Sequence, residues 1–268
     1  MYSKIDMIGC IVQARMGSSR LPGKVMEKIE GKFLLDYVLE QLKAAKNIDK
    51  IIIATTTLSN DEVICKFLSS KNIEFFRGSS EDVLDRYYQC AKKFSIDIIV
   101  RITADNPLID PNIIDMMINE YENKKVDYLT NTLERTFPYG TEVEIFSSKI
   151  LENTWKNAKK PSEREHVTPF IRDPKNKFVL MNIKNSENFS NLRYTVDKID
   201  DLKLVREIVK NISMRPIHIQ DIIKLYKQKP EIFKINKNIK HDGYKSSLKK
   251  DKEYVKSKQE ERGLNEKN

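Results

Sequence analysis

Short apolar runs rich in β-branched residues recur along this chain, and stretches with helical periodicity separate them. Runs of four to eight such residues are typical of buried β-strands. The first four lie in the N-terminal half of the chain, and the later four follow before residue 197. The strands expected from this pattern are residues 8–13, 51–56, 73–77, 97–103, 126–130, 141–146, 178–183 and 193–196.

Helical patterns lie between the first four strands. Apolar residues recur on one face between residues 34 and 45, and a capping box of Ser59 and Glu62 precedes a second helix. Residues 81–94 form a third helical stretch, and Asp110 followed by Pro111 starts a fourth. This βαβαβαβα order predicts an α/β fold of three layers, αβα, with a mostly parallel sheet. Ligands of such sheets bind beyond the carboxyl ends of the strands.

The second half of the chain has a different character. Residues 141–146 alternate between polar and apolar, which indicates an antiparallel strand or an inserted substrate region. Residues 235–268 mix both charges and contain few apolar side chains. We therefore expect one domain over residues 1–234, followed by a charged tail that is partly helical or disordered. A nucleic-acid arm would be more purely basic, so nucleic acid is not a favoured partner.

Composition excludes several classes of protein. The chain has 268 residues, a net charge of +9, 40% hydrophobic and 32% charged residues. No apolar run approaches the roughly 20 residues of a membrane span, and the N-terminus lacks a signal-peptide pattern, so a cytoplasmic protein is expected. The three cysteines are widely spaced within apolar segments and are expected to be buried thiols. Without a Cys/His cluster, a zinc enzyme is not indicated.

The loop after the first strand concentrates groups that bind phosphate. Residues 13–24 contain two glycines, two serines, two arginines and a lysine. Glycine lets backbone amides approach an anion, and hydroxyls and cations complete a polyphosphate site. The spacing fits neither a Walker A loop nor a dinucleotide fingerprint. The alternative is a flexible surface loop that carries its charges by chance.

The segment RMGSSRLPGK at residues 15–24 resembles the corresponding loop of the sugar cytidylyltransferases. That superfamily includes the 3-deoxy-manno-octulosonate and acylneuraminate enzymes, and the likeness is greatest to the spore-coat polysaccharide branch. It extends over roughly residues 8–210, and residues 242–248 are also similar to this branch. The resemblance implies a Rossmann-like sheet of the nucleotide-diphospho-sugar transferase type with an antiparallel substrate or dimerisation insertion, and a homodimer.

The resemblance also implies roles for the loop residues. Arg15, Ser19, Arg20 and Lys24 would hold the triphosphate of CTP, with Arg15 and Lys24 acting in catalysis. Fixed cations suit this reaction because negative charge develops on the leaving pyrophosphate. The remaining residues expected near the nucleotide are Gln13, Ala14, Gly17, Ser18 and Arg101.

Two aspartates follow strand-like runs and are candidate Mg²⁺ ligands. Asp105 ends the run ITAD, and Asp197 ends the run YTVD. Mg²⁺ prefers hard oxygen ligands, and an aspartate beyond a strand end is well placed for it. The alternative for Asp105 is a turn residue before Asn-Pro. Asp200 and Asp201 are interpreted as charges in the first turn of a helix. We expect Asp105 and Asp197 to flank Mg²⁺, with Asp105 also catalytic.

Two middle segments resemble the same branch. In PYGTEVE at residues 138–144, Glu142 and Glu144 share one face of a strand and could contact the acceptor or lie in solvent. In REHVTP at residues 164–169, Arg164 and His166 are candidate acceptor contacts. The structural alternative there is a capping box of Ser162 and Glu165. Asp82 and Arg86 could border the nucleotide, although helix capping and an i,i+4 ion pair explain them equally well.

These observations favour a cytidylyltransferase that transfers CMP from CTP to a sugar acid or related hydroxyl-bearing metabolite and releases pyrophosphate. The product would serve surface polysaccharide or glycan biosynthesis. One alternative is a nucleotide-sugar glycosyltransferase on the same fold, but no Asp-x-Asp motif stands at a convincing strand end. A second alternative is a basic protein that binds nucleotides or RNA without chemistry.

Overall fold

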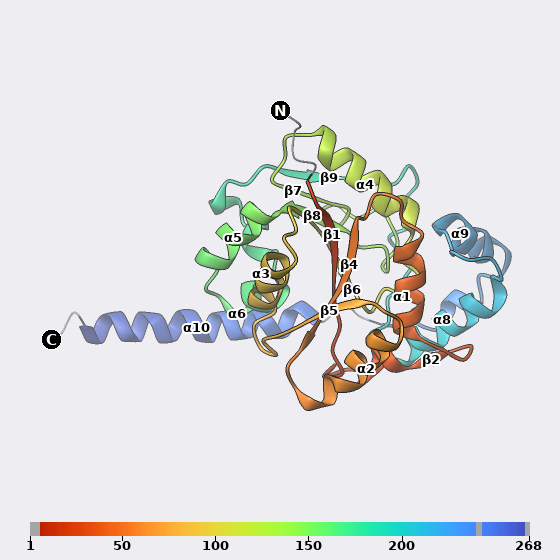
Figure 1. Ribbon diagram of the computed structural model, residues 1–268, viewed down its shortest axis with the longest axis horizontal. Helices are drawn as coiled ribbons and strands as arrows, with labels where there is room; N and C mark the ends of the chain where they lie inside the picture. The colour runs from red at the N-terminus through yellow and green to blue at the C-terminus, as the bar shows by residue number, and fades with distance from the viewer. Residues whose placement is uncertain (1–5, 240–242, 266–268) are drawn as a thin grey trace.

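In the computed structural model, which describes residues 6–239 and 243–265, a seven-stranded sheet is covered by helices on both faces (Figure 1). The strand order is β5-β4-β1-β6-β8-β7-β9. Strands β5, β4, β1 and β6 are mutually parallel, as the sequence predicted, whereas β8 runs antiparallel to β6 and β7. The strands of this sheet are β1 Ile8–Gln13, β4 Lys50–Thr56, β5 Glu74–Gly78, β6 Ile98–Thr103, β7 Tyr128–Thr130, β8 Glu144–Ser147 and β9 Leu180–Asn182.

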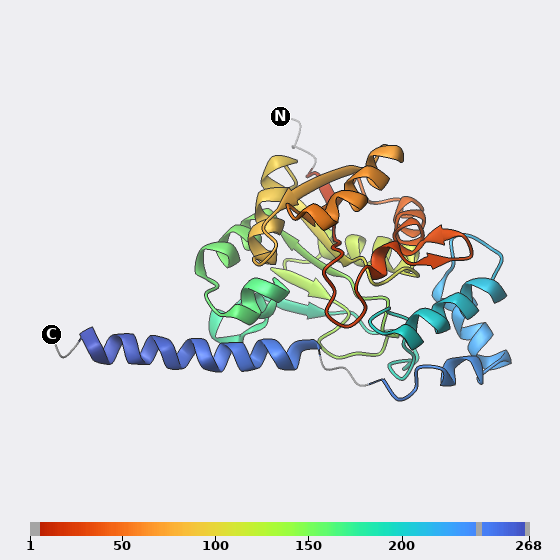
Figure 2. The same ribbon diagram turned by 90° about the horizontal axis from the view of Figure 1, so that it is seen from below.

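Helices from both halves of the chain cover this sheet, and a small antiparallel pair, β2 Lys28–Ile29 and β3 Lys32–Phe33, lies apart from it. The helix α10 leaves the body and extends well beyond it (Figure 2). Among the described residues, no helix is long and apolar enough to cross a membrane. The helices are α1 Leu34–Lys43, α2 Glu62–Ser70, α3 Val83–Lys93, α4 Pro111–Asn123, α5 Ser148–Asn157, α6 Pro161–His166, α7 Pro169–Arg172, α8 Ile199–Asn211, α9 Ile219–Gln228 and α10 Gly243–Asn265.

The strands are buried on both faces, because side chains alternate between two apolar cores. On β1, Cys10 and Val12 face the core under α1 and α4, whereas Ile11 faces the core under α3 and α5. The three cysteines are all buried free thiols, as expected from their apolar surroundings. Both layers of helices therefore pack on β1 and β6, which lie inside the sheet. The candidate site lies at the carboxyl ends of these two strands.

The later strands differ from the prediction. The segment expected as a strand at 141–146 joins the sheet only from Glu144, because Asn131 bonds the carbonyl of Thr141 and the amide of Val143 with its side chain. The strands expected at 126–130 and 178–183 shorten to three residues each. Residues 193–196 form no strand, since their backbone bonds to two loops: Tyr194 N donates to Tyr139 O, and Val196 N donates to Asp105 O.

The predicted capping box of Ser59 and Glu62 is wrong, and so is the alternative box of Ser162 and Glu165. Helix α2 begins at Glu62 without a side-chain cap, because the carboxylate of the preceding Asp61 accepts from Met16 N and Thr56 N instead. In α6, Glu163 accepts from Lys160 N, and Ser162 bonds to Asp251. The start of α4 is confirmed, since Asp110 accepts a hydrogen bond from Asn112 N directly after the proline.

Candidate active site

The loop between β1 and Lys24 is held by one buried carboxylate. Asp61 Oδ1 accepts from Met16 N at 2.7 Å, and Met16 O accepts from Ser18 N and Gly23 N at 2.9 Å each. Gly23 has a φ of +73°, a left-handed conformation that favours glycine. These contacts curl the loop over the carboxyl end of β1, which directs its charged side chains toward the centre of the sheet.

Lys24 points from this loop to both predicted metal ligands. Its Nζ lies 2.9 Å from Asp105 Oδ2, 3.0 Å from Asp197 Oδ1 and 2.8 Å from Val196 O. Burial alone would lower the pKa of Lys24, but the two carboxylates outweigh that effect and raise it. Lys24 therefore remains charged and joins the loop to both aspartates.

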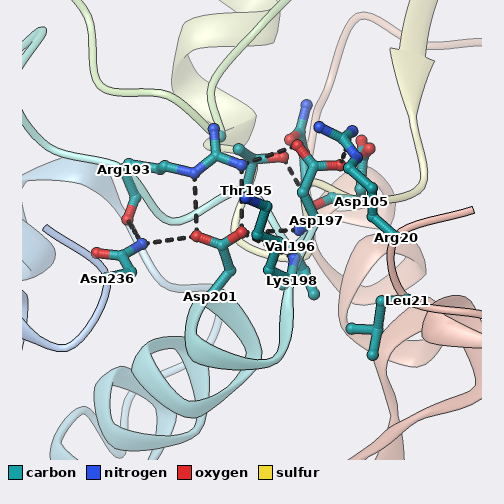
Figure 3. A network of polar contacts seen from close by, with 12 residues as sticks. Arg20, Leu21, Asp105, Arg193, Thr195, Val196, Asp197, Lys198, Asp201 and Asn236 are labelled. Atoms are coloured by element: carbon teal, nitrogen blue, oxygen red, sulfur yellow. Dashed lines mark hydrogen bonds and ion pairs between the residues drawn. The ribbon is translucent and has the colours of Figure 1, made fainter. Parts of the chain in front are cut away.

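A chain of buried ion pairs holds Asp197 from the other side (Figure 3). Arg193 donates to Asp197 Oδ2 at 2.8 Å and to Asp201 Oδ1 at 3.0 Å, and Arg20 donates to Asp197 Oδ1 at 2.5 Å. Asp201 is fully buried and also accepts from Asn236 Nδ2 at 2.8 Å. Asp201 is therefore more than a charge in the first turn of α8, because it orients Arg193 and through it Asp197.

The same contacts set the ionisation of Asp197. Burial alone would raise its pKa, but Lys24, Arg193 and Arg20 outweigh burial and lower it to about 2. The carboxylate is therefore ionised throughout the neutral range, as a metal ligand must be.

The carboxylate oxygens of Asp105 and Asp197 suit Mg²⁺ in the way that proteins commonly bind it. Asp105 and Asp197 approach one another closely enough to share a single ammonium, so one cation already lies between them. The described residues contain no cluster of three or more metal-ligating side chains. Mg²⁺ commonly binds through one or two carboxylates together with substrate phosphates and water, so two aspartates beside a phosphate loop fit it.

Two adjoining pockets open at this edge of the sheet. The loop pocket, of about 440 Å³, is lined by every predicted nucleotide-binding residue except Gly17. The inner pocket, of about 360 Å³, is lined by Glu142, Glu144, His166 and Asp197 among others. The two pockets share Arg20, Arg101, Thr103, Asp105 and His166. The predicted site residues are thus largely brought together around a common junction.

Glu144 and Glu142 are paired rather than freely solvated. Glu144 is buried, forms an ion pair with Arg101 and accepts from Tyr128 and Thr168. Burial alone would raise the pKa of Glu144, but Arg101 and Arg172 outweigh it and lower the pKa. Glu142 pairs with Arg135 at 2.8 Å. Both carboxylates therefore shape the wall of the inner pocket.

Arg164 lies outside both pockets, unlike its neighbour His166. Its Nε donates to Asp82 Oδ2 at 2.8 Å, and its NH1 donates to Trp155 O at 2.8 Å. Asp82 in turn caps α3 by accepting from Asp85 N. The expected i,i+4 pair of Asp82 with Arg86 is absent from the described contacts, because Arg86 donates to Ser79 O instead.

Sequence reasoning missed three arginines that line the inner pocket: Arg135, Arg172 and Arg193. Arg135 stacks on the ring of Tyr139, 3.8 Å from its centroid. Within residues 6–239 and 243–265, Arg172 makes no side-chain hydrogen bond or ion pair. Arg193 stands at the same alternating positions as Thr195 and Asp197, a signal that could have identified it. No sequence signal marks Arg172.

Comparison with known proteins agrees with this geometry. A family model described as cytidylyltransferase matches residues 9–242. An uncharacterised protein of Methanocaldococcus jannaschii is 38% identical over 237 residues, which cover 88% of this chain and 96% of that protein. The spore coat polysaccharide biosynthesis protein SpsF of Bacillus subtilis is 29% identical over 229 residues, covering 82% of this chain and 94% of SpsF.

A solved structure is also similar to this chain. A cytidylyltransferase from Leptospira borgpetersenii serovar Hardjo-bovis has a TM-score of 0.84 at 33% sequence identity, covering 88% of this chain and 100% of that one. The match to the family model includes the loop, both aspartates and the inner-pocket arginines, since all of them fall within residues 9–242. The chain is therefore a member of the cytidylyltransferase family.

Proposed function

We propose that this protein transfers CMP from CTP to a hydroxyl group of a sugar acid or a related anionic metabolite and releases pyrophosphate. The observation that carries the proposal is the pair of adjoining pockets that share Arg20, Arg101 and Asp105. A nucleotide in the loop pocket and an acceptor in the inner pocket would meet at these residues. Holding both reactants side by side removes much of the entropy cost of a bimolecular reaction.

The loop pocket suits the triphosphate. Arg15, Arg20 and Lys24 place three cations along it, and Ser18 and Ser19 line it beside them with hydroxyl groups. As the bond between the α-phosphorus and its bridging oxygen breaks, negative charge grows on the departing pyrophosphate. Cations fixed before the reaction stabilise that charge without reorganising.

We propose Mg²⁺ as the cofactor, held by Asp105 and Asp197. When bound, Mg²⁺ would supply charge stabilisation to the phosphates. Lys24 and Arg193 lower the pKa of Asp197 and orient its carboxylate, and Lys24 also donates to Asp105.

The inner pocket favours an acceptor that carries a negative charge. Four of its five arginines are paired with carboxylates: Arg20, Arg101, Arg135 and Arg193. Among the residues that the structure describes, Arg172 forms no ion pair with a carboxylate. The half-buried guanidinium of Arg172 is suited to bind a carboxylate through two parallel hydrogen bonds. This agrees with the sugar acids that the sequence resemblance implies.

The proposal is tested by pyrophosphate release from the purified chain with Mg²⁺, each of the four nucleoside triphosphates and a panel of sugar acids, sugar phosphates and neutral sugars. We expect release with CTP and a sugar acid, and a product heavier than the acid by one CMP unit in mass spectrometry. Arg172→Ala should weaken the acceptor response and leave CTP binding intact, with exposed Lys66→Ala as control. Activity with sugar phosphates alone, or with none of the panel, would contradict the assignment.

Two wider expectations also remain proposals. The product would feed surface polysaccharide or glycan synthesis, for which the similarity to SpsF is the support. A homodimer is expected from the sequence resemblance, and light scattering coupled to size-exclusion chromatography would measure it.

A further inference from the structure

Helix α10 packs against the body of the protein through its first turns. It begins directly after the family match ends at residue 242, and it extends away from the sheet (Figures 1 and 2). Its main neighbour is α6. Asp251 accepts from Ser162 N at 2.8 Å and from Ser162 Oγ at 2.6 Å, at the start of α6. This polar anchor fixes the rotation of α10 relative to α6.

A second contact lies at the other end of α6. Ser247 is fully buried, although Ser246 and Leu248 on either side of it are exposed. Its Oγ donates to Glu165 Oε2 at 2.9 Å and lies 2.8 Å from His166 Nε2. A hydroxyl has one proton to donate, and here Glu165 accepts it. The serine oxygen must therefore accept from the imidazole, which places the proton of neutral His166 on Nε2.

His166 is the residue through which this contact reaches the site. Its side chain lines both the loop pocket and the inner pocket, and Glu165 and Ser246 line the loop pocket beside it. Burial lowers the pKa of His166, with Arg101 and Arg172 acting in the same direction and Glu165 and Glu144 opposing them. A neutral imidazole has two possible tautomers, and its ring can rotate. Which ring nitrogen donates at the junction of the two pockets therefore depends on the hydrogen bonds that hold the ring.

We propose that Ser247 is a positioning residue, which fixes His166 in the Nε2–H tautomer and holds its ring at the junction of the two pockets. Helix α10 is accordingly a part of the site rather than an appendage. The consequence for nucleotide binding rests on the proposed function, whereas the tautomer and the orientation of the ring do not.

The first test reads the tautomer in the full chain without any ligand. Long-range proton–nitrogen NMR spectra of the ¹⁵N-histidine-labelled protein distinguish protonated from unprotonated ring nitrogens. We expect His166 to have a protonated Nε2 that exchanges slowly, and Ser247→Ala to give mixed tautomers or faster exchange. A wild-type ring protonated on Nδ1 would overturn the proposal even if the variant failed to fold. Ser257→Ala is the matched control, because exposed Ser257 bonds within α10 to Tyr254 O.

The second test measures the dissociation constant of CTP in the presence of Mg²⁺ by calorimetry. Loss of one neutral hydrogen bond should weaken binding about 3- to 10-fold in Ser247→Ala. Ser247→Thr, which keeps the hydroxyl, should recover most of the affinity, and Ser257→Ala should match wild type. Equal affinity of Ser247→Ala and wild type would refute the link to the nucleotide. Failure of wild type to bind CTP would instead refute the proposed function, and the NMR result would still decide the role of Ser247.

Discussion

Lys24 and Asp197 stand 173 positions apart in the sequence, yet Lys24 Nζ lies 3.0 Å from Asp197 Oδ1. The contact joins the phosphate loop after β1 to the segment before α8, which forms no strand of its own. It is also where the predicted nucleotide and metal groups meet. A change at either residue should therefore affect both the site and the packing around it.

Lys24→Ala should lower the rate of pyrophosphate formation by about 10²-fold or more, because it removes a cation fixed beside the departing phosphates. Arg15→Ala should act in the same direction. Lys66→Ala, on the exposed face of α2, removes an equal charge from a residue that lines neither pocket and should leave the rate unchanged. Steady-state kinetics with whichever acceptor of the panel supports pyrophosphate release would measure this, and near-normal rates in both loop variants would rule out their role.

A neighbouring pair of aspartates offers a matched test of the buried network. Asp201 is fully buried against Arg193, whereas Asp200 lies in solvent and pairs with Lys203. Asp201→Asn should reduce the free energy of unfolding by about 3 kcal/mol, because it leaves a buried guanidinium with one carboxylate fewer. Asp200→Asn should cost no more than about 0.5 kcal/mol. Urea unfolding measures both, and equal losses would show that the network contributes little.

The sequence predicted those parts of the candidate site that lie in one stretch or that follow an apolar run. The loop after β1 is contiguous, so its glycines and cations could be recognised together, and Asp105 and Asp197 each follow an apolar run. The structure places the loop and Asp105 at the carboxyl ends of the parallel strands β1 and β6, as expected. Asp197 reaches the same edge from a segment that forms no strand.

The remaining residues depend on contacts that sequence spacing does not reveal. Arg172 reaches the inner pocket from the last turn of α7, which no motif marks. Arg164 and His166 stand two positions apart on α6, and residues at that spacing on a helix face different directions. Hence His166 lines the pockets, whereas Arg164 pairs with Asp82. The sequence indicates only a first-turn charge for Asp201. Its partner Arg193 lies in a segment that is expected to be a strand, so the sequence does not suggest that the two side chains meet.

The free energy of unfolding should fall in acid, because Asp197 becomes protonated there. Its pKa is lowered in the folded protein from 3.8 to about 2, so the ionised form stabilises the fold above about pH 4. As the pH falls from about 4 to about 2 this contribution disappears, and a shift of this size corresponds to about 2 kcal/mol. Urea unfolding across this range should show a steeper loss in wild type than in Asp197→Asn. If the free energy of unfolding fell equally with pH in the two proteins, the loss of stability in acid would not come from Asp197.

Gly140 and Gly31 form a second matched pair, because both have positive φ but different surroundings. A methyl group at Gly31 would meet no atom within 4 Å, whereas one at Gly140 would lie 2.6 Å from the buried ring of Tyr194. Gly31→Ala should therefore cost only the backbone strain of about 1 kcal/mol.

Gly140→Ala should cost about 2 kcal/mol more, because the close-packed ring cannot move aside. The methyl group would also stand 3.0 Å from Thr195 N, so the segment that carries Asp197 must shift. We therefore expect Gly140→Ala to lower the rate of pyrophosphate formation, whereas Gly31→Ala keeps it. Unfolding curves and kinetics on the two variants measure these effects separately. A stable Gly140→Ala protein with full activity would show that the position of residues 193–197 is not set by this contact.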